Sequence, residues 1–307
     1  MAQPEVPFSR LTGCFPKQKV VDIGAYQIAG EPVYAPLLVG HDSELVGFEP
    51  NPQALAELQK ASGPRRKFLP YAIGDGRPGK LHICAARDMS SLLRPNPEVL
   101  RLFHGFPIWG QVIAIEPIDT VRLDDIAETE GLTFLQMDIQ GAELLALQNA
   151  QNRLRDALVL HIEVEFLQLY ADQPLFSDVE LFLRQRGFVF HRFSTPVSRV
   201  IQPLMVDGNI MAGLSQLVWS DAVFVRDFSR LEDLENNRLL AMAAIVHDCY
   251  NSWDLALHLL NEIDRRTQQT LGQNYLSRLT GTTKTEPAAA TPQQSKQSRK
   301  SPSRRRS

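Results

Sequence analysis

Carboxylates that follow two apolar segments near the N-terminus indicate a nucleotide-binding site. Residues 20–21 are valines that lead to Asp22, Gly24 and Ala25, and residues 45–48 lead to Glu49. A buried parallel strand that turns at a glycine lets backbone N–H groups approach a ligand, and a carboxylate after the next strand can accept both ribose hydroxyl groups. The alternatives are a tight turn without a ligand and a solvated acid at a helix start. Taken together, the two motifs favour the binding site.

Asp138 ends a later core strand, at the sheet edge where Asp22 is also expected. Ligands bind at this edge in open α/β sheets. The Asp138 carboxylate could therefore hold a substrate, act as a base or contact the amine of a cofactor. Glu143 follows on the first turn of a helix, where packing or the helix dipole explains an acid.

His161, Glu163 and Glu165 alternate along one expected strand, so they share a face. Polar side chains on a core strand need partners. One interpretation is an acid–base or metal cluster near Asp138, and the other is a hydrogen-bonded structural network. Because carboxylate-rich metal sites rarely have such short spacing, we predict no metal and favour Glu163 as a catalytic or substrate-orienting residue.

The elements that position these residues alternate between strand and helix, which indicates an α/β fold with a mostly parallel sheet. Ala72, Ile73 and Asp75 end the third expected strand, where they would lie beside an adenine or form an ordinary turn. Asn51 and Pro52 supply the N-cap and first-turn proline of a helix. Strands are expected at residues 19–23, 45–49, 67–73, 81–84, 112–115, 132–138, 157–166, 188–193 and 217–225, and further helices at 141–150 and 177–186.

The character of the chain changes after Asp227. Residues 231–246 and 254–279 are expected to form a helical hairpin with an apolar stripe, packed on the sheet domain or on a partner. From residue 281 the chain is rich in Ser, Gln, Pro and Arg, which predicts disorder. We therefore expect a sheet domain at 1–230, the hairpin at 231–280 and a basic tail at 281–307.

Composition limits the class of protein. The 307 residues are 44% hydrophobic, and no apolar run reaches the ~20 residues of a membrane span. The N-terminus lacks a signal-peptide pattern and the three cysteines are scattered, so we expect a cytoplasmic protein. The net charge of -3 divides into +6 from residue 284 on and -9 before it. Such a tail could contact nucleic acid or anionic lipid, but without interleaved aromatic residues we favour a solubilising end.

Several of these motifs resemble those of the FkbM-like methyltransferases. The most specific is the block of residues 137–143, Met-Asp-Ile-Gln-Gly-Ala-Glu. The resemblance covers about residues 15–227 and implies S-adenosylmethionine-dependent O-methyl transfer on a Rossmann-like, seven-stranded sheet. Further matching motifs lie at residues 20–25, 46–50, 71–75, 90–93, 123–125, 187–188 and 219–221.

The resemblance also implies roles for single residues. Asp138 would line the transfer site. Tyr26 and Ile28 stand where relatives often carry asparagine and then glycine or proline. Tyr26 would therefore narrow the cofactor pocket or stack on the substrate, with an effect on cofactor affinity. The methionine part of the cofactor would be faced by Asp22, Gly24 and Ala25, the ribose by Glu49, and the adenine by Ala72 and Ile73.

Methyl transfer from a sulfonium requires an acceptor oxygen in line with the methyl group and a base for its proton. Asp138, Glu163 and His161 are the candidates for this base, in that order. The segment at residues 85–111, with His104 and Trp109, could cap the acceptor pocket. We predict a methyltransferase that acts on a hydroxyl group of a sugar, glycan or secondary metabolite.

Three other functions share part of the pattern. A non-catalytic methyltransferase-like domain would serve as an interaction module through its hairpin and tail, and the hairpin could also mediate a homo-oligomer. A nicotinamide oxidoreductase would need Gly-x-Gly-x-x-Gly, which is missing, and Asp22 would repel its pyrophosphate. A nucleic-acid methyltransferase is disfavoured because no Asn-Pro-Pro-Tyr-like motif occurs.

Overall fold

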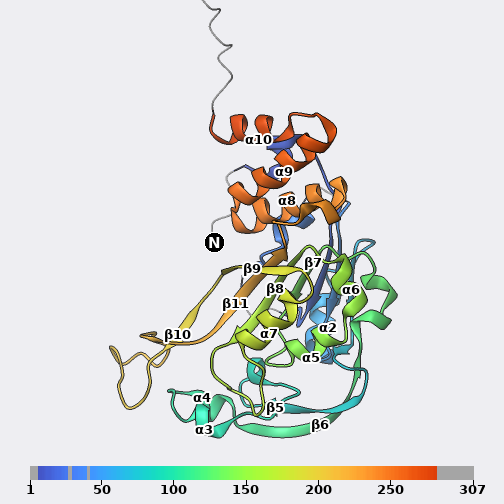
Figure 1. The fold of residues 1–307 in the computed structure, drawn as a ribbon. Coiled ribbons are helices and arrows are strands. Elements are labelled where there is room, and N and C mark those ends of the chain that lie inside the picture. The colour runs from blue at the N-terminus through green and yellow to red at the C-terminus, as the bar shows by residue number, and fades with distance from the viewer. Residues whose placement is uncertain (1–5, 27–29, 40–41, 282–307) are drawn as a thin grey trace, which may run out of the picture.

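An eight-stranded sheet forms the centre of the computed structural model, which describes residues 6–26, 30–39 and 42–281 (Figure 1). The strand order is β10-β11-β8-β7-β1-β2-β3, with β9 paired to β11. The mostly parallel sheet predicted from the sequence is confirmed, and β10 adds a strand to the seven expected. The parallel strands are β1 (Lys19–Ile23), β2 (Glu44–Phe48), β3 (Arg66–Leu69), β7 (Phe134–Met137) and β8 (Val159–Glu165). β11 (Gln216–Arg226) is antiparallel to β8, β9 (Phe188–Phe193) and β10 (Val197–Arg199).

Helices cover both faces of this sheet (Figure 1). Phe134 and Val223 face one hydrophobic cluster, whereas Leu135 and Phe224 face the other. This alternation follows from the two-residue period of a strand. The first cluster lies under α2 (Pro52–Gln59), the 3-10 helix η1 (Ala35–Leu38) and α8 (Asn236–Tyr250). The second lies under α5 (Glu143–Gln148), α6 (Gln151–Asp156) and α7 (Phe176–Arg184).

A smaller three-stranded sheet lies at the end of the molecule away from the C-terminal helices (Figure 1). It consists of β4 (Ala72–Ile73), β5 (Pro78–Cys84) and β6 (Val112–Val121). The single strand expected at residues 67–73 is therefore wrong, because its halves belong to β3 and β4. Pro70 follows β3 and has no N–H group to continue the ladder. Between β5 and β6 the chain forms η2 (Arg87–Met89), α3 (Pro97–Leu100) and α4 (Phe106–Trp109).

The C-terminal region contains three helices rather than the expected hairpin: α8, α9 (Trp253–Thr267) and α10 (Leu271–Leu279). Gln268, with a φ of 56°, ends α9, as left-handed residues commonly do. The N-terminal helix α1 (Phe8–Thr12) packs beside α10, where Phe8 contacts the ring of Tyr275. Residues of α8 and α9 share the first cluster with the sheet. Most of the predicted tail, residues 282–307, lies outside the described residues.

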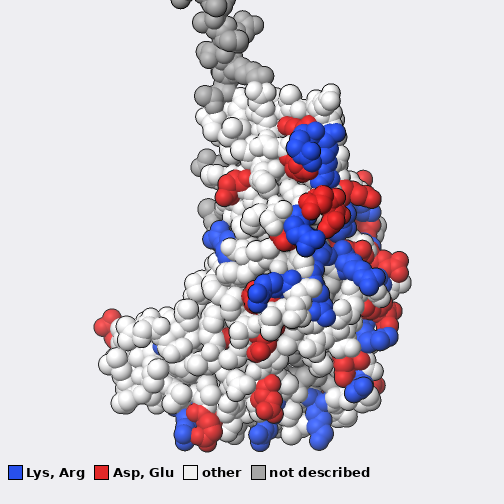
Figure 2. Space-filling model, viewed as in Figure 1, with Lys and Arg blue, Asp and Glu red and all other residues white. Residues whose placement is uncertain are grey.

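The arm formed by β10, β11 and the loop between them extends sideways from the sheet (Figure 1). In the same view the arm carries few charged side chains (Figure 2), and Leu204, Met211 and Leu214 are exposed on it. None of the described helices combines the length and the apolar composition that a membrane crossing requires. The remaining short helices are η3 (Leu123–Asp125), η4 (Ala127–Thr129) and η5 (Leu231–Asp233).

Candidate active site at the carboxyl edge of the sheet

Asp22 lies near the carboxyl end of β1 and is only 1% exposed. Its Oδ2 accepts a hydrogen bond from Tyr34 Oη, whereas its buried Oδ1 has no partner among the described residues. Burial raises the pKa of Asp22 to about 7, the Tyr34 hydrogen bond opposes this shift, and the Asp138 carboxylate adds to it. Buried polar atoms are nearly always hydrogen-bonded in native proteins. The orphan oxygen therefore fits a ligand that donates a hydrogen bond, such as an ammonium group.

Gly24 allows the main chain of β1 to pass close to the end of β7. Its φ is +83°, and a Cβ atom there would lie 2.0 Å from the carbonyl oxygen of Asp138. The N–H groups of Gly24 and Ala25 both donate to the carbonyl oxygen of Phe48, at 3.1 and 3.0 Å. These two N–H groups are therefore occupied within the sheet, and the glycine is needed for the contact with Asp138.

Glu49 follows β2, as predicted, and is 9% exposed. Its Oε1 accepts a hydrogen bond from Asn51 N at 2.7 Å and lies 3.7 Å from Arg87 Nη2. Burial raises the pKa of Glu49, while Asn51 and Arg87 act in the opposite direction. The Arg87 guanidinium also lies 4.9 Å from the centre of the Tyr26 ring. Arg87 thus connects the expected cap segment with Glu49 and Tyr26, two of the predicted cofactor residues. Ile28 lies outside the described residues.

The residues expected beside an adenine differ in their surroundings. Ala72 and Ile73 are buried in β4. Asp75 Oδ1 accepts hydrogen bonds from Arg77 N at 3.0 Å and Thr120 Oγ1 at 3.3 Å, so this side chain stabilises the turn before β5. Tyr71 is 39% exposed, and its ring centre lies 6.4 Å from that of Phe48. Tyr71 was not singled out in the sequence, although it directly precedes Ala72.

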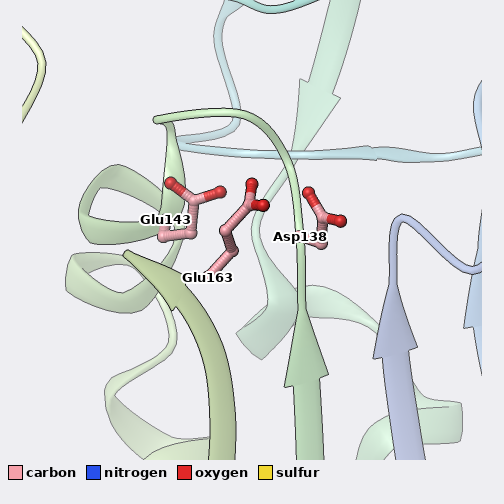
Figure 3. Close-up of side chains that lie close together, drawn as sticks. All are labelled: Asp138, Glu143 and Glu163. Carbon is pink, nitrogen blue, oxygen red and sulfur yellow. The ribbon is translucent and has the colours of Figure 1, made fainter. Parts of the chain in front are cut away.

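Three carboxylates meet beyond the ends of β7 and β8 (Figure 3). Asp138 follows β7, Glu143 begins α5 and Glu163 lies on β8. One oxygen atom of each lies within 4.8 Å of the others. Asp138 is exposed, Glu163 is partly buried and Glu143 is buried. The structure therefore brings the two leading base candidates together and adds Glu143, which we had expected to serve packing or the helix dipole.

The Gln140 side chain connects two of these carboxylates. Its Nε2 donates to Asp138 Oδ1 and to Glu163 Oε2, both at 2.7 Å. Tyr170 Oη lies 3.1 Å from Gln140 Oε1, and Ser91 Oγ donates to the Gln140 carbonyl at 2.7 Å. Gln140 itself has a φ of 57°. Tyr170 thus orients the side-chain amide, whose donor end faces the carboxylates and whose O and N are assigned from the hydrogen-bond network, while Ser91 holds the main chain of Gln140.

Burial, more than the neighbouring carboxylates, makes this cluster hold protons more tightly than free acids do. Burial raises the pKa of Glu143 to about 8, and Asp138 contributes. Burial also raises the pKa of Glu163 well above its usual range, with contributions from Asp138, Glu165 and Glu143. Desolvation also raises the pKa of Asp138, although part of this residue is exposed to solvent. Over the described chain, no lysine or arginine forms an ion pair with the three carboxylates.

The cluster also has the chemistry of a divalent-cation site, because carboxylate oxygens are the ligands that Mg²⁺ prefers. Gln140 bears on this possibility. Its amide donor already occupies one oxygen of Asp138 and one of Glu163. A cation could bind these two oxygens only if the Gln140 side-chain amide rotated away from them. That rotation would break the hydrogen bond that Tyr170 Oη donates to Gln140 Oε1. The present arrangement therefore suits shared protons better than a metal ion.

His161, the third base candidate, lies apart from this cluster and is 6% exposed. Its Nδ1 lies 3.1 Å from Tyr250 Oη on α8, and its Nε2 lies 3.6 Å from Asp221 Oδ2 on β11. Within the described ranges, no hydrogen bond or ion pair joins it to Asp138 or Glu163. His161 thus takes part in the structural network that was the alternative interpretation of its strand.

The two residues expected over the acceptor pocket contact other parts of the protein. His104 Nε2 lies 2.8 Å from the carbonyl oxygen of Leu204, in the loop between β10 and β11. Trp109 packs on Phe106, with ring centres 5.6 Å apart. The segment at residues 85–111 contacts the surroundings of the carboxylate cluster at two points. Ser91 Oγ donates to the Gln140 carbonyl, and the Met89 carbonyl accepts a hydrogen bond from Tyr170 Oη.

A parallel sheet with carboxylates at its carboxyl edge is typical of α/β enzymes that bind nucleotide-like ligands. The model of the methyltransferase FkbM domain matches residues 22–190, which is 169 of the 307 residues. The chain belongs to the FkbM methyltransferase family and is a methyltransferase. The resemblance identified in the sequence is thereby confirmed.

Solved structures that are similar to this chain include the following two. One is a SAM-dependent methyltransferase from Aquifex aeolicus, with 11% identity, a TM-score of 0.27, and coverage of 68% of this chain and 84% of that one. The other is the N-terminal domain of EvdMO1 with SAH bound, with 9% identity, a TM-score of 0.30, and coverage of 73% and 82%. No curated protein sequence has significant similarity to the chain.

Proposed function

We propose that the protein transfers a methyl group from S-adenosylmethionine to a hydroxyl group of a sugar, glycan or secondary metabolite. The observation that carries the proposal is the pairing of Asp138 with Glu163 at the same sheet edge as Asp22 and Glu49. In this proposal Asp22 and Glu49 form the cofactor side, and Asp138 and Glu163 form the proton-accepting side.

S-adenosylmethionine, when bound, supplies an activated methyl group. On the protein side, Asp22 Oδ1 has an unused acceptor for the ammonium group, and Glu49 can accept the ribose hydroxyl groups. Arg87 and Tyr26 lie beside Glu49 and would limit the width of this part of the cleft. Because the N–H groups of Gly24 and Ala25 donate to Phe48, these two residues would line the methionine side by van der Waals contact and not as N–H donors. Ala72, Ile73 and the turn at Asp75 would line the adenine side.

Asp138 takes the proton of the acceptor hydroxyl as the oxygen attacks the methyl carbon. Its exposure lets an acceptor reach it, whereas Glu143 is buried. Burial raises the pKa of Asp138 and favours proton uptake, whereas Glu163 and Gln140 oppose this rise. Glu163 shares the Gln140 amide with Asp138 and lies close enough to accept the proton in its place. Glu163 is therefore the second candidate for the base, and His161, held by Tyr250, is the third.

The proposal is tested with tritiated S-adenosylmethionine and a mixture of mono- and disaccharides, by counting label in the methylated product. We expect transfer by the parent protein and a loss of about 10²–10⁴-fold in Asp138→Asn, the usual contribution of a general base. Cofactor affinity should be unchanged in this variant. Equal transfer by Asp138→Asn would exclude Asp138 as the base. A parent protein that binds no cofactor would instead support the non-catalytic interaction module.

A further inference from the structure

Five arginines surround a cavity of about 350 Å³ that the methyl-transfer site does not use. The cavity lies where α6, the turn after α7, the end of β11 and the first turn of α8 meet. The arginines are Arg155, Arg186, Arg226, Arg230 and Arg238.

This cavity lies at the opposite edge of the sheet from the carboxylate cluster. The Arg226 N–H donates to the carbonyl oxygen of Leu158, just before β8 begins, whereas Glu163 lies near the other end of β8. The five residue steps from Leu158 to Glu163 correspond to about 16 Å along the strand. In Figure 1, α6 and α8 accordingly lie away from the β5–β6 sheet. A ligand in the cavity would not overlap the cofactor.

The cavity carries excess positive charge. Asp227 and Asp233 are its acidic lining residues, so its formal charge is +3. In the part of the chain that the structure describes, no carboxylate forms an ion pair with any of the five guanidinium groups. Asp227 Oδ1 instead accepts hydrogen bonds from the N–H and hydroxyl groups of Ser229.

Three of the five arginines are fixed and two are free. Arg186 donates to Gln151 Oε1 at 3.2 Å and to the carbonyl oxygen of Phe182 at 2.9 Å. Arg226 donates to the carbonyl oxygens of Ala157, Arg155 and Arg186, at 2.7, 2.8 and 3.0 Å. Arg238 Nη2 donates to the carbonyl oxygen of Asp156 at 2.7 Å. The side chains of Arg155 and Arg230 make no hydrogen bond within the described residues and are exposed.

Like charges in this wall repel one another. Burial, followed by the charge of Arg238, lowers the pKa of Arg226 to about 10. A bound anion would relieve that repulsion and would accept hydrogen bonds from the free guanidinium groups. Arginine forks match the oxygens of phosphate groups, to which they donate paired hydrogen bonds.

We propose that this cavity is a binding site for a small ligand with two adjacent phosphate groups, either pyrophosphate or a pyrophosphate ester. The volume of about 350 Å³ equals that of roughly twelve water molecules, at about 30 Å³ each in the liquid. A single phosphate group, with its five heavy atoms, would fill only part of this cavity. Two of the fixed arginines, Arg226 and Arg238, hold one side of the site, and Arg155 and Arg230 close on the ligand from the exposed side.

Calorimetric titration of the full chain with pyrophosphate, ADP and inorganic phosphate tests the proposal. The Arg155→Gln/Arg230→Gln variant removes the two free donors, and Arg65→Gln/Arg101→Gln is the control, because it removes the same charge from exposed arginines elsewhere. We expect one pyrophosphate per chain and a weakening of about tenfold for each arginine removed from the cavity. The control should bind as the parent does. Thermal unfolding checks that each variant is folded, and Arg230→Gln alone replaces the double variant if it is not.

Tighter binding of ADP than of pyrophosphate would identify an ester as the ligand, and the reverse order would identify free pyrophosphate. The proposal is overturned if pyrophosphate does not bind, if the control loses as much affinity as the cavity variant, or if inorganic phosphate binds as tightly as pyrophosphate. Saturating S-adenosylhomocysteine should leave pyrophosphate binding unchanged, and competition between them would contradict a separate site. Because this readout does not depend on methyl transfer, the two proposals can fail independently.

Discussion

Asp138 and Glu163 are held on opposite sides of one amide group, with Gln140 Nε2 at 2.7 Å from an oxygen of each. The amide is oriented in turn by Tyr170. Asp138 and Glu163 therefore share a donor. Burial raises the pKa of both, and the charge of Asp138 adds to the rise at Glu163, whereas the contact with Glu163 opposes the rise at Asp138. This relationship leads to predictions that separate proton transfer from cofactor binding.

Shortening the amide should impair chemistry without impairing cofactor binding. Gln140→Asn keeps a residue type that tolerates a left-handed φ but cannot reach both carboxylates. We expect kcat to fall by about tenfold to a hundredfold, while the Kd for S-adenosylmethionine stays within twofold. The pH dependence of kcat should also shift, because the amide stabilises the ionised carboxylates. A variant with unchanged kcat and an unchanged pH profile would show that the amide serves only the loop.

The buried Glu143 should make the protein less stable as pH rises. Its folded-state pKa of about 8 lies above the ordinary value of 4.5, so between these values the folded state binds more protons than the unfolded state. Stability is therefore lost as pH rises through that window. Glu143→Gln keeps the acceptor for Ile139 N and removes the charge.

Urea unfolding at pH 5 and pH 8 measures this effect. The parent should lose on the order of 2 kcal/mol more than Glu143→Gln between the two pH values. Glu57→Gln, at an exposed position on α2, is the control and should follow the parent. A pH dependence that is the same in Glu143→Gln and in the parent would mean that Glu143 is not protonated in the folded state.

Removal of divalent cations should leave methyl transfer intact. The Gln140 amide occupies oxygens of Asp138 and Glu163 that a cation would need. We therefore expect the same initial rate before and after dialysis against EDTA, and no gain on adding Mg²⁺. A rate that is lost in EDTA and restored by Mg²⁺ would show that the cluster binds a metal ion.

Tyr26 should influence cofactor affinity through Arg87. The guanidinium lies 4.9 Å from the ring centre and 3.7 Å from Glu49, so the ring helps to place a cation beside the proposed ribose acceptor. Loss of an exposed cation–π contact of about 0.5–1 kcal/mol should weaken S-adenosylmethionine binding about two- to fivefold in Tyr26→Asn. Tyr26→Phe retains the ring and is the matched control. If Tyr26→Asn leaves both affinity and turnover unchanged, the departure at this position is only a variant turn.

Sequence patterns predict the strands of this fold better than its contacts. The strands before Asp22 and Glu49 are continuous apolar runs buried on both faces, and the structure contains both. Pro70 marks the end of β3 in the sequence, although the apolar pattern continues past it. The end of α9 at Gln268 has no glycine or proline to mark it. A left-handed residue of another type leaves little local signal.

The candidate site was predictable only where residues end neighbouring strands. Asp138 and Glu163 were singled out because the carboxyl ends of parallel strands share an edge. Arg87 and the partner of His161 were not, because they depend on contacts between distant parts of the chain: Tyr250 lies 89 residues beyond His161. The division into domains at residue 230 remains a prediction. The sheet and the C-terminal helices share one hydrophobic cluster.

Calorimetric titration of the parent protein and of Glu49→Ala with S-adenosylmethionine tests the central claim most directly. The proposed site predicts one molecule bound per parent chain and an affinity lower by about tenfold to a hundredfold in Glu49→Ala, because charged acceptors contribute strongly to hydrogen bonds. The same affinity in both proteins would place the cofactor elsewhere, and no binding by either would contradict the methyltransferase mechanism proposed for this site.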